Sequence, residues 1–139
     1  MARLLKKRSK FNIEAPPPEN QKVVLIADDS EMVRNFHSYI LKNAGFTIIS
    51  AIDGADALEK LLQHDINLVV TDINMPNMNG YEFVKRIRGM DGYDDLPVIM
   101  ISTESEAQDK QKGYDAGANV YIVKPTPPDQ LVESINLLL

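Results

Sequence analysis

The chain has 139 residues, of which 44% are hydrophobic and 25% are charged, which is the composition of one globular domain with a sizeable core. It contains no cysteine, which excludes a disulfide framework, a thiolate nucleophile and a cysteine-ligated zinc site. No apolar stretch approaches the ~20 residues of a membrane span, and the N-terminus lacks an apolar signal-peptide core, so a cytoplasmic location is expected.

The net charge of −5 is unevenly distributed along the chain. Residues 1–10 carry five basic side chains and no acid, whereas residues 21–139 carry 10 basic and 18 acidic side chains. An acidic body argues against direct binding of nucleic acid by the main domain, because such binding needs a basic face.

Residues 1–20 are predicted to be a basic, proline-rich and disordered N-terminal tail, followed by one domain over residues 21–139. Three successive prolines at 16–18 favour an extended conformation and cannot join a helix interior. Three interpretations of the tail remain open: a solvated extension, attraction to an anionic surface such as lipid or RNA, and docking to a partner.

From Lys22 onward, strand and helix patterns alternate, which is typical of βαβ units. Short apolar runs predict buried parallel strands over 22–27, 47–51, 68–71, 98–101 and 120–123. Helical spacing and turn signals predict helices over 31–43, 55–63, 81–88 and 107–116, and a last helix that begins near Pro128. Right-handed crossovers would place helices on both faces of the sheet.

Three of the helices have apolar residues at helical spacing. In the first these are Met32, Val33, Phe36, Tyr39, Ile40 and Leu41. In the second, one side is formed by Ala57, Leu58, Leu61 and Leu62. In the last, the expected inner face consists of Leu131, Val132, Ile135, Leu138 and Leu139.

Five polar residues stand at the ends of apolar strands: Asp28, Asp29, Asp72, Ser102 and Lys124. In open α/β sheets, ligands bind beyond the carboxyl ends of the strands, so these side chains are expected to converge. Three carboxylates repel one another unless a cation offsets them, and Mg²⁺ prefers such oxygen ligands. The pattern predicts a metal site that also receives a phosphoryl group, with the lysine pairing with phosphoryl oxygens and the serine donating to them.

Structural interpretations of single residues remain open beside this one. Asp29 and Ser30 precede a helix, where N-capping residues are favoured. Asp72 begins a turn-rich segment, and aspartate is common in turns. The joint pattern at successive strand ends, rather than any one residue, favours the site.

The motifs around these residues resemble those of response-regulator receiver domains of the CheY-like type. They are Asp28-Asp29-Ser30, the segment 72–80 (DINMPNMNG), Ile101-Ser102 and the segment 121–125 (YIVKP). The resemblance covers residues 22–139. It implies an α/β, flavodoxin-like (βα)5 fold, which is a doubly wound five-stranded parallel sheet of order 2-1-3-4-5.

The resemblance also implies a role for each residue. Asp72 corresponds to the phosphoacceptor, and Asp28, Asp29, Asp72 and the backbone carbonyl of Asn74 correspond to the ligands of Mg²⁺, for which Mn²⁺ can substitute. Lys124 corresponds to the phosphate-binding lysine. Ser102 and Tyr121 match the switch pair, and Asn74 and Glu104 fall where side chains tune hydrolysis of the acyl phosphate.

The implied partners are a histidine kinase or phosphotransfer protein as donor and a downstream protein target. Phosphorylation adds charge and three strong acceptors, and Ser102 moving toward them would let Tyr121 swing inward. The target surface would then be formed by the fourth helix, the fifth strand and the last helix. Thr126 and Thr103 depart from the family pattern, at the partner surface and beside the switch serine.

The leading hypothesis is a stand-alone, chemotaxis-like receiver in two-component signalling, which is not an enzyme beyond its own phosphorylation and dephosphorylation. One alternative is the receiver portion of a larger regulator whose output domain binds DNA or handles cyclic dinucleotides. A Mg²⁺-dependent phosphohydrolase is disfavoured because such enzymes commonly carry a second aspartate where this chain has Asn74. A pseudo-receiver is disfavoured because no site residue is missing.

Overall fold

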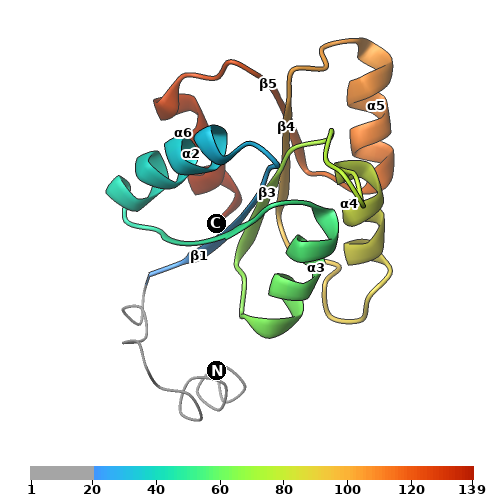
Figure 1. Ribbon diagram of the computed structural model, residues 1–139, viewed down its shortest axis with the longest axis horizontal. Coiled ribbons are helices and arrows are strands. Elements are labelled where there is room, and N and C mark those ends of the chain that lie inside the picture. The colour runs from blue at the N-terminus through green and yellow to red at the C-terminus, as the bar shows by residue number, and fades with distance from the viewer. Residues whose placement is uncertain (1–20) are drawn as a thin grey trace.

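The computed structural model describes residues 21–139, and the predicted tail over residues 1–20 lies outside the described residues. The five strands are β1 (Val23–Ala27), β2 (Thr47–Ala51), β3 (Leu68–Thr71), β4 (Val98–Ser102) and β5 (Val120–Val123). The helices are α2 (Glu31–Asn43), α3 (Gly54–Gln63), α4 (Gly80–Arg88), α5 (Ala107–Ala116) and α6 (Pro128–Leu138). All strand pairs are parallel, and the sheet order β2-β1-β3-β4-β5 confirms the predicted fold (Figure 1).

Helices cover both faces of the sheet, so the domain has three layers (Figure 1). Alternate side chains of each strand point to opposite faces and enter two separate cores. On one face, Val24 and Ile26 of β1 pack with Leu41 of α2 and with Leu131 and Ile135 of α6. On the other face, the core contains residues of α3, α4 and α5, including Leu61, Phe83 and Ala116. Burial on both faces explains why the strands consist of apolar runs.

Side-chain caps begin three of the helices. Ser30 caps α2, Asp53 caps α3 and Asn79 caps α4, each accepting a bond from the backbone N–H three residues later. The helices α3 and α4 begin directly after their caps, at Gly54 and Gly80, which is one residue earlier than predicted.

The buried side of α2 differs from the apolar pattern. His37 and Leu41 are its buried residues, whereas Met32, Phe36 and Tyr39 are exposed to 81%, 52% and 68%. The helix faces the sheet along its Leu41 side, and this orientation leaves the other large apolar side chains outside.

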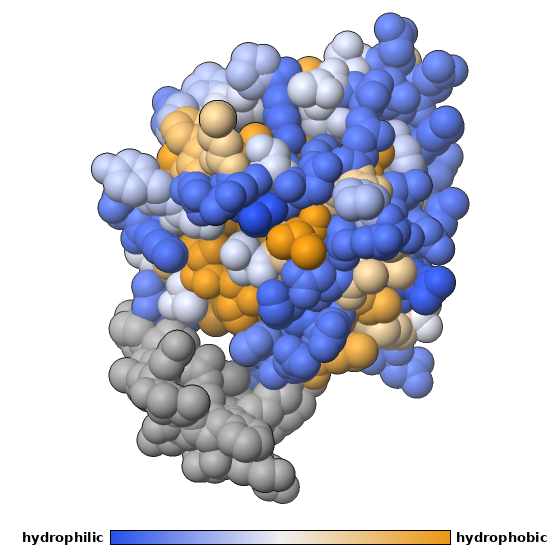
Figure 2. All heavy atoms as spheres, viewed as in Figure 1, coloured by the Kyte–Doolittle hydropathy of each residue, from blue (hydrophilic) through white to orange (hydrophobic). Residues whose placement is uncertain are grey.

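The predicted inner faces of α3 and α6 are correct for most residues. Leu62 of α3 is exposed, as is Leu139 beyond α6, whereas Leu131 and Ile135 are buried as expected. Among residues 21–139, no helix is both long and apolar enough to cross a bilayer. The face seen in Figure 2 is largely hydrophilic, with separate apolar patches.

Candidate phosphorylation site

The carboxyl edge of the sheet brings the predicted site residues together. In the register of β1 and β3, Ala27 lies beside Thr71, so Asp28 and Asp72 follow neighbouring strands at the same level. The Asp72 N–H donates to the carbonyl of Ala27 at 2.9 Å, which ties the two strand ends.

Asp28, Asp29 and Asp72 form an acidic cluster at this edge. Carboxylate oxygens of the three residues lie within 4.8 Å of one another. Asp28 and Asp72 are buried, with 2% and 8% of their surface exposed, whereas Asp29 is exposed and opens the cluster to solvent. Like charges this close are costly unless a cation lies beside them.

Lys124 supplies one such cation. Its Nζ lies 3.0 Å from Asp28 Oδ2 and 3.5 Å from Asp72 Oδ2, so one ammonium bridges both buried carboxylates. Its backbone N–H donates to the carbonyl of Ser102 at 2.8 Å, and a cis bond to Pro125 follows. The end of β5 is thereby held beside the end of β4, and the lysine side chain extends over the edge of the sheet.

Burial raises the pKa of Asp72 above its ordinary value of 3.8. Lys124 opposes this rise, and the charge of Asp28 adds to it. The carboxylate also accepts a bond from the N–H of Ile73 at 2.7 Å, which orients one oxygen and leaves the other toward the lysine. A buried carboxylate whose negative charge is incompletely offset is suited to accept a further cation.

The donor set of the acidic cluster fits a hard divalent cation. Three carboxylates offer oxygen ligands only, and the exposed Asp29 leaves a side on which water and phosphate oxygens can complete the coordination of Mg²⁺. The residues able to hold it are Asp28, Asp29 and Asp72.

The remaining predicted residues form the rim of the site. The amide of Asn74 donates to Glu104 Oε1 at 3.1 Å, which links the loops after β3 and β4. Ser102 is fully buried, and its hydroxyl accepts a bond from the N–H of Glu104 at 3.1 Å. Tyr121 is only 9% exposed, and its hydroxyl donates to the carbonyl of Glu104 at 2.7 Å. Tyr121 therefore already occupies the inward position that is expected after phosphorylation.

Comparisons with known proteins identify the family of this chain. The model of the family described as "Response regulator receiver domain" matches residues 24–136. The chain belongs to this family.

Two relatives and one solved structure illustrate the membership. Protein PilG of Pseudomonas aeruginosa is 36% identical over 112 residues, which cover 81% of this chain and 83% of that protein. The chemotaxis protein CheY1 of Helicobacter pylori is 36% identical over 118 residues, which cover 84% of this chain and 95% of that protein. The structure of the chemotaxis response regulator CheY4 of Vibrio cholerae superposes with a TM-score of 0.82 at 36% identity, covering 86% of this chain and 100% of that one.

Two residues near the site of this receiver domain, Asp53 and Gly113, are not indicated by the sequence patterns. Asp53 is buried behind the loop after β3, and the signal that could have found it is Asp-Gly between a strand and a helix. Gly113 of α5 lies against Tyr121, since a Cβ there would be 2.9 Å from the ring. His37 is also buried, and burial and the charge of Lys124 lower its pKa, whereas the charge of Asp28 opposes this change.

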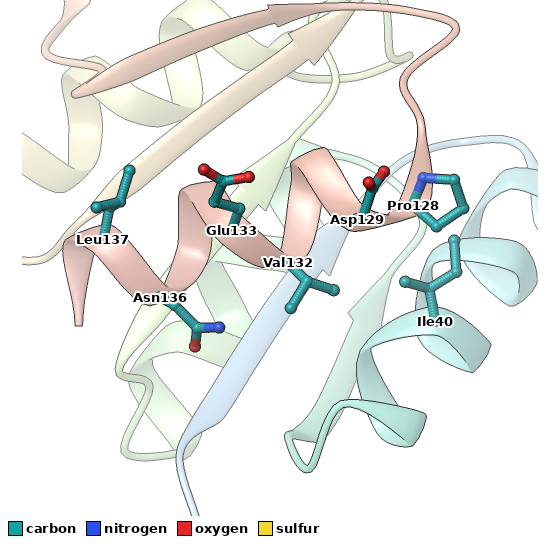
Figure 3. Close-up of a pocket in the computed structure, with 7 residues that line it drawn as sticks. All are labelled: Ile40, Pro128, Asp129, Val132, Glu133, Asn136 and Leu137. Atoms are coloured by element: carbon teal, nitrogen blue, oxygen red, sulfur yellow. The ribbon is translucent and has the colours of Figure 1, made fainter.

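A hollow of about 550 Å³ lies between α2 and α6 of the receiver domain (Figure 3). It is lined by Ile40, Pro128, Asp129, Val132, Glu133, Asn136 and Leu137. None of these is a candidate site residue, so the candidate phosphorylation site and this hollow are separate features.

Proposed function

We propose that this receiver accepts a phosphoryl group on Asp72 from a histidine kinase or phosphotransfer protein and thereby switches protein binding. The observation that carries the proposal is the position of Asp72. Its buried carboxylate lies within 4.8 Å of the carboxylates of Asp28 and Asp29 and is paired with Lys124.

In the proposed reaction, a carboxylate oxygen of Asp72 attacks the phosphorus of a phosphohistidine. The oxygen–phosphorus bond forms as the nitrogen–phosphorus bond breaks, and the leaving imidazole takes a proton from solvent. Mg²⁺, held by Asp28, Asp29, Asp72 and the backbone carbonyl of Asn74, would offset negative charge on the carboxylates and phosphoryl oxygens, and Mn²⁺ could replace it. Lys124 is within reach to pair with the transferred group as a compact charge.

The output of the proposed switch is a change in the surface of α5, β5 and α6. Ser102 would donate its hydroxyl to the phosphoryl group, and its present bond from the N–H of Glu104 would reorganise. Glu104 is also hydrogen-bonded to Tyr121 and to Asn74. Its movement would therefore change both the target surface and the entrance to the site. The same two side chains, Asn74 and Glu104, are proposed to tune hydrolysis of the acyl phosphate.

A stand-alone, chemotaxis-like role is favoured by the relatives that are named as chemotaxis proteins. The match with this chain covers 95% of the length of one of them and 91% of another. The alternative is a larger regulator with an output domain, and an open reading frame that continues past Leu139 would establish it. We also propose that the chain turns over no external substrate. Sustained hydrolysis of phosphate monoesters by the pure protein would instead revive the phosphohydrolase hypothesis.

The test is incubation of the purified protein with acetyl phosphate and Mg²⁺, followed by intact-mass measurement. The expected result is the addition of one phosphoryl group, which EDTA suppresses and Asp72→Asn abolishes. Asp91→Asn, a substitution of an exposed loop aspartate, is the matched control and should label like the unaltered chain. Unchanged labelling of Asp72→Asn would contradict the assignment.

A further inference from the structure

Two loops at the carboxyl edge are tied together by a side-chain hydrogen bond between residues 24 positions apart. The amide of Asn77, in the loop after β3, donates to Asp53 Oδ2 at 2.7 Å. Asp53 lies between β2 and α3 and is 5% exposed. It is a buried acid outside the acidic cluster.

Both carboxylate oxygens of Asp53 are used. Oδ1 accepts a bond from the N–H of Asp56 at 2.8 Å, which caps α3, and Oδ2 accepts the amide of Asn77. These bonds lower the pKa of Asp53, so it remains an anion at neutral pH. A hydrogen bond to a charged acceptor is stronger than a neutral one, and this one joins an exposed loop to a capped helix end.

The backbone around the tether is also closely fitted. Asn77 has a φ of 67°, in the left-handed region that asparagine tolerates better than most residues. The N–H of Gly54 donates to the carbonyl of Met78 at 3.1 Å, and a Cβ on Gly54 would collide with that carbonyl. The two loops therefore meet backbone to backbone beside the tether.

The tethered loop is the one that contains Asp72 and Asn74. Its far end is closed by a bond from the N–H of Gly80 to the carbonyl of Ile73 at 2.8 Å, so residues 73–80 form a compact loop. Asn77 fixes the tip of this loop, three residues after the proposed carbonyl ligand. A change at the tip thus alters the loop that carries this ligand.

We propose that Asp53 and Asn77 are positioning residues for divalent-cation binding, which hold the loop after β3 in the geometry that the metal requires. This inference rests on the proposed function, since it concerns the same metal site. Neither side chain belongs to the acidic cluster, and both would act through the backbone of residues 73–78. Groups that orient metal ligands in this indirect way typically change metal affinity by about 10- to 100-fold when removed.

Two substitutions of Asn77 separate the tether from the backbone conformation. Asn77→Gly keeps the left-handed conformation without strain and removes the amide. Asn77→Asp places a second carboxylate against Asp53 and replaces attraction by repulsion. The double substitution Asp53→Asn with Asn77→Asp reverses donor and acceptor, and asparagine at position 53 still caps the helix.

The first measurement is Mg²⁺ binding by titration calorimetry, without any phosphodonor. Asn77→Gly and Asn77→Asp are expected to weaken binding by about tenfold or more, and the double substitution is expected to restore most of the loss. Asn43→Asp, at the exposed end of α2, adds the same charge elsewhere and should bind like the unaltered chain. Unaltered affinity in both Asn77 variants, or failure of the double substitution to restore it, would overturn the proposal.

The second measurement is hydrogen exchange in EDTA, which reports on the loop without metal. Faster exchange of the amides of Met78 and Gly80 is expected in Asn77→Gly, with exchange in β1 and β3 unchanged. Equal exchange in the two proteins would contradict a tether. If Asp72→Asn still abolishes labelling by acetyl phosphate while the Asn77 variants bind Mg²⁺ normally, the positioning role fails and the proposed function stands.

Discussion

Replacement of Asp72 by asparagine is expected to stabilise the metal-free protein at neutral pH. Asparagine has nearly the same shape, and its oxygen can still accept the bond from the N–H of Ile73. What changes is the removal of one buried negative charge from a group of three. The prediction therefore isolates the electrostatic cost of the site.

The magnitude follows from the distances in the site. At an effective dielectric constant of about 20, the attraction between Lys124 Nζ and Asp72 Oδ2 at 3.5 Å is about 5 kcal/mol. At 4.8 Å, the upper limit of the separations in the cluster, repulsion is about 3.5 kcal/mol for each of the two other carboxylates, and the repulsion from the exposed Asp29 is further screened. Attraction and repulsion nearly cancel, so the burial cost of the charge decides the sign. A gain on the order of 1–3 kcal/mol in the free energy of unfolding is expected.

The pH dependence has a definite sign. Because the folded-state pKa of Asp72 is raised, the native protein binds the proton more tightly than the unfolded chain does. The ionised side chain therefore destabilises the fold above its raised pKa, and this penalty disappears as the pH falls through that pKa toward 3.8. The advantage of Asp72→Asn should shrink over the same range.

Urea denaturation followed by circular dichroism, in EDTA at pH 7 and again near the ordinary pKa of aspartate, measures both effects. Added Mg²⁺ should stabilise the unaltered protein more than the variant, because the variant lacks one carboxylate ligand. Asp91→Asn, in an exposed loop, should change stability by less than about 0.5 kcal/mol. A variant less stable than the unaltered chain at pH 7 in EDTA would mean that pairing with Lys124 outweighs burial and repulsion, and would refute the reasoning.

Three further substitutions test other parts of the structure. Lys124→Ala leaves two buried carboxylates without their shared cation, so a loss of about 3–5 kcal/mol in stability is expected at neutral pH. A smaller loss is expected below the raised pKa of Asp72, as urea denaturation at two pH values would show. Gly113→Ala should force the ring of Tyr121 outward and move the pKa of its phenol from about 12, where burial holds it, toward its ordinary value of 10.0, measurable by NMR titration. Arg88→Lys removes most of the five hydrogen bonds that join α4 to the loops before β4 and β5, so a loss of about 2–4 kcal/mol in stability is expected. The control Arg86→Lys, at an exposed ion pair, should cost about 0.5 kcal/mol or less.

The strands, their order and the convergence of the acidic residues could be predicted because they depend on local patterns. Apolar runs marked the buried strands, and parallel strands necessarily bring their carboxyl ends to one edge. Asp28 and Asp72 therefore lie together as expected. In the structure α3 begins one residue earlier than the apolar pattern predicts, because Asp53 caps it.

The packing of α2 could not be predicted in this way. Its apolar residues occupy more than one side of the helix, and the side that becomes buried is chosen by contact with the sheet and α6. His37 is buried and Phe36 is exposed, although hydrophobicity alone favours the reverse. The bond between Asp53 and Asn77 was likewise beyond prediction, because it depends on how two separate loops meet in space.

The most direct test of the central claim is the location of the phosphoryl group on the chain. After incubation with acetyl phosphate and Mg²⁺, borohydride reduction converts an aspartyl phosphate into homoserine, which peptide mass spectrometry can locate. The account predicts homoserine at position 72 and unmodified aspartate at positions 28 and 29. Homoserine at either of those positions, or none at position 72 in a labelled sample, would contradict it.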